Sequence, residues 1–202
     1  MLHVQDLIQD ILNNQIPEER QKLLSPLTEY IIESQRTEGQ TQLNFICTHN
    51  SRRSQFSQVW AHIAAEHFQV NIACHSGGVE ITACNERTVE SLKRLGLIVQ
   101  VSGTDNPKYE IIFKENTPPI LCYSKLYNDP NSPSANFATI MTCAHADENC
   151  PVIPGATTRI PIRYEDPKKF DDTNLEEIMY DERSMQIASE MFYVIQQVKS
   201  LL

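Results

Sequence analysis

The sequence predicts an α/β fold: a three-layer sandwich around a central parallel sheet of about four strands. From residue 41 onward, short apolar segments alternate with segments of helical periodicity, an order typical of parallel strands joined by crossover helices. An inserted hairpin near 109–127 interrupts this alternation. We expect an N-terminal helical extension over 1–40 and one α/β domain over 41–202.

Residues 3–36 are expected to form two helices. Pro17 followed by Glu18 and Glu19 suits the first turn of the second helix, because proline fits there and acidic side chains favour that end of the helix dipole. Pro26 lies inside the apolar pattern and is expected to kink or restart the helix. Composition does not choose among three roles for the extension: covering the domain, forming a homodimer, or recruiting a partner.

The remaining elements follow from apolar runs and helical spacing. Strands are expected at 43–47, 70–76, 137–143 and 158–164, and the two arms of the hairpin at 109–113 and 119–127. Helices are expected near 53–68, within 82–97 and over 175–202.

Charge and composition exclude several classes of protein. The formal net charge of -9 creates a field that repels nucleic acid and anionic membranes, so neither is an expected partner. The N-terminus carries acidic residues among its apolar ones, unlike a secretory signal, and no stretch approaches the roughly 20 apolar residues that span a bilayer. We therefore expect a soluble cytoplasmic protein whose six cysteines are reduced.

The segment CTHNSRRS carries the clearest chemical signal. Cys47 ends an expected strand and Arg53 opens the next helix. Successive backbone N–H groups closed by a helix N-terminus form a cradle for a tetrahedral anion. The residues expected to bind this anion are Thr48, His49, Asn50, Ser51, Arg52, Arg53 and Ser54.

Within this loop the side chains have distinct expected roles. Arg53 can hold two oxygens of the anion through parallel charge-assisted hydrogen bonds. The same positive field favours a thiolate at Cys47, the expected nucleophile, and Ser54 could donate a hydrogen bond to its sulfur. Asn50 is expected to brace the backbone. A buried cysteine and a surface arginine are the plain alternative, which the position on a strand-to-helix turn disfavours.

This loop after an apolar strand resembles the active-site loop of low-molecular-weight protein tyrosine phosphatases and of the thioredoxin-coupled arsenate reductases that share their fold. The segments HSGGVE (75–80) and NERTVESLKRLGL (85–97) resemble the second-strand motif and following helix of that family. The resemblance covers most of 41–200 but not the inserted hairpin. It implies the phosphatase-like fold and an enzyme that attacks an oxyanion with Cys47.

The resemblance also implies a proton donor, an Asp followed by Pro late in the chain. Asp166 precedes Pro167 directly after the last expected strand, near the sheet edge where ligands collect in α/β proteins. Asp-Pro is also ordinary turn chemistry. The rival acids close to it are Glu165, Asp171 and Asp172.

Cys143 and Cys150 follow the penultimate expected strand at the spacing of a cysteine pair that the arsenate reductases carry and the phosphatases lack. The resemblance implies a thiol relay. In this relay Cys47 attacks arsenate, and Cys143 attacks the Cys47 adduct, which releases arsenite. Cys150 then forms a disulfide with Cys143, and a thioredoxin-like protein reduces that disulfide.

Geometry constrains the relay segment. A disulfide needs Cα atoms within about 7 Å, whereas a helix would hold these two about 10.5 Å apart. The segment is therefore expected to be a loop or to melt on oxidation. Plain packing of Cys143 and a metal site of Cys143, His145 and Cys150 are the other interpretations; the spacing is unusual for zinc, and we expect no metal.

Three residues depart from the family pattern. His49 stands in place of the usual glycine, and Arg52 stands where a second cysteine is frequent, so no neighbour in the loop can protect Cys47 from oxidation. Gln58 replaces a glutamate associated with a potassium site, so no bound potassium is expected. We expect no cofactor.

Three hypotheses follow for the function. The leading one is an arsenate reductase, because it alone uses Cys143 and Cys150. The alternative is a hydrolase of phosphotyrosine or a small phosphomonoester that uses Cys47, Arg53 and Asp166. The third is a non-catalytic oxyanion-binding or redox-sensing module.

Overall fold

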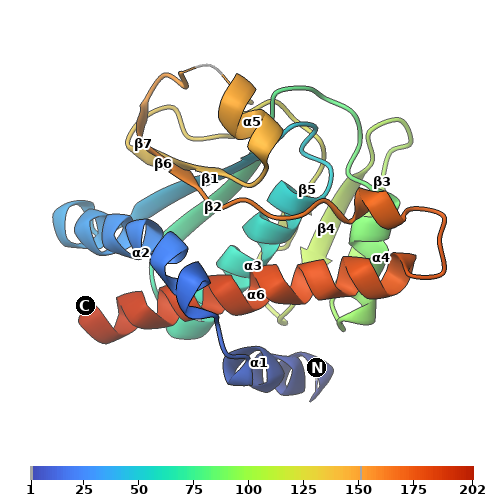
Figure 1. The fold of residues 1–202 in the computed structure, drawn as a ribbon, viewed down its shortest axis with the longest axis horizontal. Coiled ribbons are helices and arrows are strands. Elements are labelled where there is room, and N and C mark those ends of the chain that lie inside the picture. The colour runs from blue at the N-terminus through green and yellow to red at the C-terminus, as the bar shows by residue number, and fades with distance from the viewer. Residues whose placement is uncertain (1, 151) are drawn as a thin grey trace.

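The computed structural model describes residues 2–150 and 152–202. Its centre is a sheet of four parallel strands in the order β2-β1-β6-β7, with helices around it (Figure 1). The strands are β1 (Thr41–Cys47), β2 (Ile72–Gly78), β6 (Phe137–Met141) and β7 (Ala156–Pro161). This arrangement confirms the predicted fold class.

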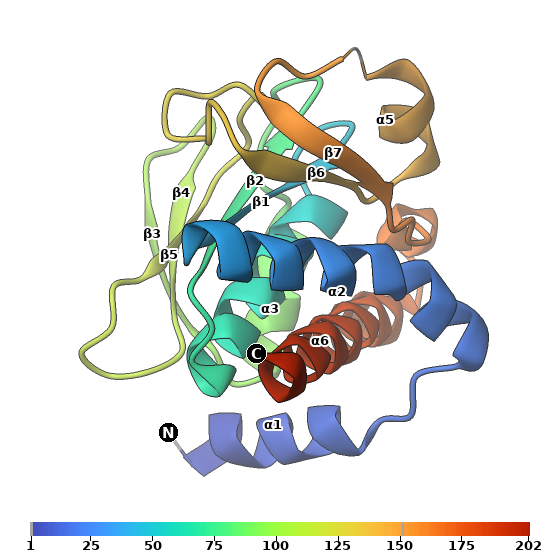
Figure 2. The same ribbon diagram turned by 90° about the vertical axis from the view of Figure 1, so that its left-hand side faces the viewer.

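Two long helices cover the sheet and meet in the core. Helix α3 (Arg53–Phe68) begins directly after the loop that follows β1, and α6 (Glu176–Leu201) packs along it (Figure 2). Trp60 of α3 is fully buried, and its Nε1 donates to Ser184 Oγ of α6 at 2.9 Å. The short helix α4 (Glu86–Arg94) also contacts α6 and is capped by the side chain of Asn85. The N-terminus of α3 is thereby fixed at the carboxyl end of β1.

The N-terminal extension forms α1 (Leu2–Asn13) and α2 (Glu18–Glu38), as predicted, but Pro26 does not interrupt α2. Leu24, Leu27 and Ile31 of α2 are fully buried in the same apolar cluster as the residues of α3 and α6. This burial holds the helix together despite the hydrogen bond that the proline removes. The division of the chain at residue 40 stays a prediction.

The inserted segment is a separate three-stranded antiparallel sheet, and not the predicted hairpin alone. Its strands are β3 (Ile98–Ser102), β4 (Lys108–Ile112) and β5 (Ile120–Cys122). Strand β3 was missed because most of it is exposed and it lacks a buried apolar run. Strand β5 is shorter than predicted because Ser124 and Lys125, just beyond it, bind the loop after β1 instead of a neighbouring strand.

The segment between Cys143 and Cys150 is a helix, α5 (Ala144–Asn149), and the 3-10 helix η1 (Pro167–Phe170) follows β7.

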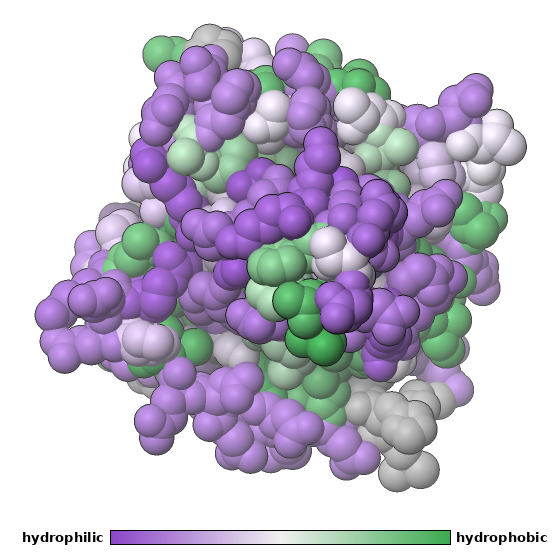
Figure 3. Space-filling view, turned by 45° about the vertical axis from the view of Figure 1, so that its right-hand side comes forward, coloured by the Kyte–Doolittle hydropathy of each residue, from purple (hydrophilic) through white to green (hydrophobic). Residues whose placement is uncertain are grey.

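On the face drawn in Figure 3, hydrophilic side chains predominate and apolar ones form small separate areas. Among the described residues, no helix has the length and apolar character to cross a membrane.

Candidate active site

A pocket opens at the carboxyl end of β1. Its lining combines the loop after β1 with residues from the segment after β7: Cys47, Thr48, His49, Ser51, Arg52, Arg53, Asp166 and Lys168. The structure therefore brings the predicted nucleophile, the loop arginine and the predicted acid into one cavity. Asn50 and Ser54, also predicted for this site, are fully buried behind it.

The sulfur of Cys47 lies 3.1 Å from Ser54 Oγ. The amide of Asn50 donates to the same Ser54 oxygen at 2.8 Å. Because Ser54 accepts the proton of Asn50, its own hydroxyl hydrogen is free to point at the sulfur. The predicted nucleophile therefore has a hydroxyl donor directly beside its sulfur.

Asn50 fixes the shape of the loop from behind. Its backbone is left-handed, with φ of 47°, and its Oδ1 accepts from the backbone N–H of Lys125 at 3.1 Å. The side chain of Gln55 donates to its carbonyl at 2.8 Å. Gly78 lies so close that a Cβ there would be 2.7 Å from the Asn50 nitrogen, so the end of β2 must be glycine.

We expect Asn50→Ala to lower the free energy of unfolding by about 2–4 kcal/mol. It leaves the buried N–H of Lys125 unpaired and places a residue with no local hydrogen bond in the left-handed region. Urea denaturation measures the effect. Asn136→Ala is the matched control, because Asn136 also has a positive φ of 56° but is exposed. Equal losses for both variants would contradict a bracing role for the Asn50 side chain.

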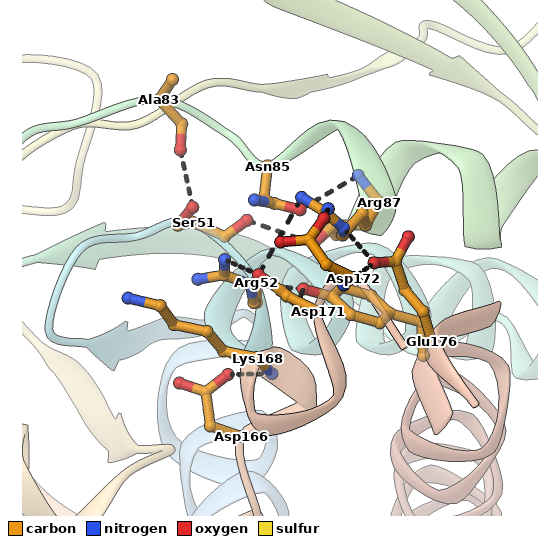
Figure 4. A network of polar contacts seen from close by, with 12 residues as sticks. Ser51, Arg52, Ala83, Asn85, Arg87, Asp166, Lys168, Asp171, Asp172 and Glu176 are labelled. Atoms are coloured by element: carbon orange, nitrogen blue, oxygen red, sulfur yellow. Dashed lines mark hydrogen bonds and ion pairs between the residues drawn. The ribbon is translucent and has the colours of Figure 1, made fainter. Parts of the chain in front are cut away.

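Arg53 is held by the segment that follows β7. Its Nη2 donates to Asp166 Oδ2 at 2.6 Å, and its Nη1 donates to the carbonyl of Tyr164 at 3.1 Å. Its buried Nε has no hydrogen-bond partner among the described residues. Asp166 also caps η1, since its Oδ1 accepts from the backbone N–H of Lys168 at 3.1 Å (Figure 4). An anion in the pocket therefore competes with Asp166 for the guanidinium.

Arg52 lines the pocket, and two of its N–H groups donate to residues outside the pocket lining. Its Nη2 donates to Asp171 at 3.2 Å (Figure 4). Its Nε donates to Tyr180 Oη at 2.7 Å, and the Tyr180 hydroxyl donates to the same carboxylate of Asp171. Arg87 pairs with Asp172 and Glu176, each at 2.7 Å. This network ties the loop to α4 and α6.

The ion pairs around the site distinguish Asp166 from the other three acids considered as proton donor. Asp171 and Asp172 are bound by arginines of the network, and Glu165 pairs with Lys169 at 3.1 Å on the exposed surface. Of the four acids, Asp166 is the one in the pocket lining.

His49 and Ser51 anchor the outside of the loop. The Nδ1 of His49 lies 3.2 Å from a carboxylate oxygen of Glu80, and its carbonyl accepts from Ser124 Oγ at 2.7 Å. The hydroxyl of Ser51 donates to the carbonyl of Ala83 at 2.7 Å, as Figure 4 shows. The Ser51 side chain is thus committed to holding the loop in place.

Cys143 lies beside Thr48, the residue that follows Cys47 in the sequence. Its sulfur is 3.5 Å from Thr48 Oγ1, which is also 3.2 Å from His145 Nδ1. The backbone N–H of Ala146 donates to the Cys143 sulfur at 3.3 Å, so this cysteine caps the N-terminus of α5. Cys150 caps the other end of α5, and burial raises the pKa of its thiol.

Within residues 2–150 and 152–202, no three or more His, Cys, Asp or Glu side chains are arranged to hold a metal ion. This holds also for Cys143, His145 and Cys150. Of the other cysteines, Cys84 and Cys122 are buried and Cys74 is half-buried, and none of them lines the pocket. Burial raises the pKa of Cys74 and Cys84 far above the usual range and that of Cys122 to about 12.

Sequence reasoning missed the part of the insert that supports the site. Ser124 and Lys125 bind the loop backbone and the Asn50 side chain, and the ammonium of Lys125 donates to Ser76 Oγ at 3.2 Å in the interior. Burial lowers the pKa of Lys125. A lysine between a serine and a leucine in an expected strand carries no sequence signal for burial.

Comparison with known proteins gives related sequences. No family model matches the chain. It is 30% identical over 124 residues to arsenate reductase 2 of Staphylococcus epidermidis, covering 61% of this chain and 76% of that protein. It is 24% identical over 132 residues to an arsenate reductase of Halalkalibacterium halodurans, covering 65% and 78%.

Solved structures share the fold. An arsenate reductase in the phosphate-binding state aligns with a TM-score of 0.51 and 16% identity, over 78% of this chain and 98% of that one. A low-molecular-weight phosphotyrosine phosphatase from Vibrio cholerae aligns with a TM-score of 0.50 and 12% identity, over 77% and 94%. Both solved structures agree with the fold of this chain.

Proposed function

The chain belongs to the family of low-molecular-weight protein tyrosine phosphatases and arsenate reductases, and we propose that it reduces arsenate with Cys47 as nucleophile and Cys143 and Cys150 as a thiol relay. The observation that carries this proposal is the position of Cys143. Its sulfur lies 3.5 Å from the hydroxyl of Thr48, the residue next to the nucleophile. A phosphatase has no use for a second thiol at this place.

The first step uses the pocket alone. Arsenate binds to the backbone N–H groups of the loop and to the Arg53 guanidinium, and displaces the carboxylate of Asp166. The Cys47 sulfur attacks arsenic; a sulfur–arsenic bond forms as an arsenic–oxygen bond breaks. The leaving group is a hydroxyl of arsenate, which departs as water with a proton from the carboxyl of Asp166; Asp166 takes up that proton from solvent once arsenate has displaced it from Arg53.

The next steps use the relay. The Cys143 sulfur attacks the Cys47 sulfur, and the sulfur–arsenic bond breaks with its electron pair left on arsenic. Arsenic is thereby reduced from the +5 to the +3 state and departs as arsenite, while the two thiols are oxidised to a disulfide. Cys150 then attacks Cys143, which frees Cys47, and a thioredoxin-like dithiol reduces the new disulfide.

The relay also supports a cytoplasmic location, where thiols are kept reduced. The burial of α2 against α6 supports a role for the N-terminal helices in covering the domain, rather than in dimerisation or partner recruitment.

The second candidate function is hydrolysis of an aryl phosphate such as phosphotyrosine, favoured by the direct contact of Arg53 with Asp166 in the pocket.

Asp166→Asn is expected to change binding and hydrolysis in opposite directions. Phosphate should bind about two- to fivefold more tightly, since the guanidinium of Arg53 loses a partly exposed ionic competitor. Aryl phosphate hydrolysis should fall about 100- to 10,000-fold, because the proton donor is gone. Calorimetric titration with phosphate and a chromogenic aryl phosphate measure the two effects.

Asp172→Asn is the control, because its carboxylate is 87% exposed and pairs with Arg87 outside the pocket. It should leave both quantities unchanged. If Asp166→Asn matched this control in both measurements, Asp166 would have no role in the site.

The test of the proposed function is arsenate-dependent oxidation of NADPH in the presence of thioredoxin and thioredoxin reductase. Turnover in this assay is the expected result. Aryl phosphate hydrolysis without arsenate turnover would make the protein a phosphatase, and inactivity toward both would leave an oxyanion-binding module.

A further inference from the structure

One arginine holds the C-terminal end of the helix between the relay cysteines. Arg159 of β7 donates from Nη2 to the carbonyls of Ala146 (3.0 Å) and Asp147, and from Nη1 to the carbonyl of Cys150 (3.1 Å). Its Nε donates to Asp147 Oδ1 at 3.2 Å. A single guanidinium thus contacts three backbone carbonyls and one carboxylate of this short segment. The positive charge of Arg159 lies at the C-terminal end of α5, where the helix dipole is negative.

The carboxylate of Asp147 has a second partner. Arg163, just beyond β7, donates from Nε to Asp147 Oδ2 at 2.9 Å. The Asp147 side chain is 13% exposed, so these contacts lie partly out of water. Helix α5 is thereby tied to β7 and the residues that follow it.

These contacts are the main anchor of α5. The helix has six residues, and the one buried among them is Ala146, which offers little apolar surface. A helix this short is unstable by itself in water, so its form depends on what it is attached to. Besides the side-chain contacts of Asp147 with Arg163 and of His145 with Thr48, its backbone is held by the Cys143 cap at one end and by Arg159 at the other.

Oxidation of the pair must break this anchor. Six residues separate the two cysteines, and helical geometry holds their Cα atoms about 10.5 Å apart. A disulfide needs them within about 7 Å. The segment must therefore unwind, which withdraws its carbonyls from Arg159. The contacts of Arg159 to α5 thus belong to the dithiol form.

We propose that Arg159 is a positioning residue that stabilises the dithiol form of the Cys143–Cys150 pair and so raises its reduction potential. The inference rests on the proposed relay and deepens it. A group that stabilises the reduced form makes the pair a stronger oxidant. Arg159 thereby favours transfer of electrons from a thioredoxin-like dithiol into the pair, which is the step that returns the enzyme to its starting state.

The test is the reduction potential of the pair in Arg159→Met, measured in the Cys47→Ser background so that Cys143 can pair with Cys150 alone. Proteins are equilibrated with mixtures of reduced and oxidised dithiothreitol, alkylated and analysed by mass spectrometry. Methionine keeps the apolar stem and removes every donor. The equilibrium should shift at least about tenfold toward the disulfide, a fall of about 30 mV in potential.

Arg163→Met is the matched control. Its guanidinium contacts the same Asp147 carboxylate but none of the α5 carbonyls. Its shift should be less than a third of that of Arg159→Met. Asp147→Asn is a second variant, which keeps the backbone carbonyls in place and should shift the equilibrium in the same direction by a smaller factor.

The outcomes separate the two proposals. An unchanged potential in Arg159→Met and Asp147→Asn, with a disulfide that still forms between Cys143 and Cys150, would overturn the role of Arg159 and leave the relay intact. If the pair formed no disulfide in the protein with Arg159 in place, the relay itself would be wrong, and the role of Arg159 with it.

Discussion

Replacing Cys47 with serine should abolish arsenate reduction and aryl phosphate hydrolysis together, each by at least about a thousandfold. A serine hydroxyl is a far weaker nucleophile than a cysteine sulfur at neutral pH. The loop backbone and Arg53 remain, so phosphate binding should persist. Steady-state rates and calorimetric titration with phosphate measure these effects.

Cys74→Ser provides the comparison, since Cys74 lies outside the pocket and burial raises the pKa of its thiol. It should retain full activity. Measurable turnover of either substrate by Cys47→Ser would show that another group performs the attack.

Replacing Cys143 with serine should separate the two activities. Arsenate turnover with thioredoxin should fall at least about a thousandfold, because the Cys47 adduct cannot be resolved by a hydroxyl. Aryl phosphate hydrolysis should stay within about twofold of the original rate, since that reaction needs only the pocket. Serine is a strong N-cap, so α5 should keep its N-terminal cap.

Both assays are run on the same preparation of Cys143→Ser, so that hydrolysis serves as the internal control for folding. Loss of both activities would mean that Cys143 supports the loop structurally. Retention of both would remove Cys143 from the mechanism.

The central sheet and the loop were predictable because their signals are local. Most residues of β1 are apolar. Cys47, Arg53 and Ser54 fall within one stretch of eight residues that contains the turn from β1 to α3. Strand β6 also stands out as a short apolar segment. Such patterns depend on neighbours in the sequence and survive without knowledge of the fold.

What escaped prediction depends on distant contacts. Arg52 is bound by Tyr180, 128 positions away, and Asn50 by Lys125, 75 positions away. Strand β3 exists because it pairs with β4, although its own side chains are largely exposed. Helix α5 consists of six polar and small residues that give no helical periodicity of their own, and it likewise has a distant contact, the hydrogen bond that Arg159 donates to Ala146 from 13 positions away.

The most direct test of the central claim is a single turnover without reductant. The reduced protein is mixed with excess arsenate, arsenite is quantified, and the disulfides are mapped by mass spectrometry of proteolytic peptides. The proposed relay predicts one arsenite released per chain, a disulfide between Cys143 and Cys150, and a free Cys47. Absence of arsenite and of that disulfide, in a preparation that still hydrolyses an aryl phosphate, would contradict it.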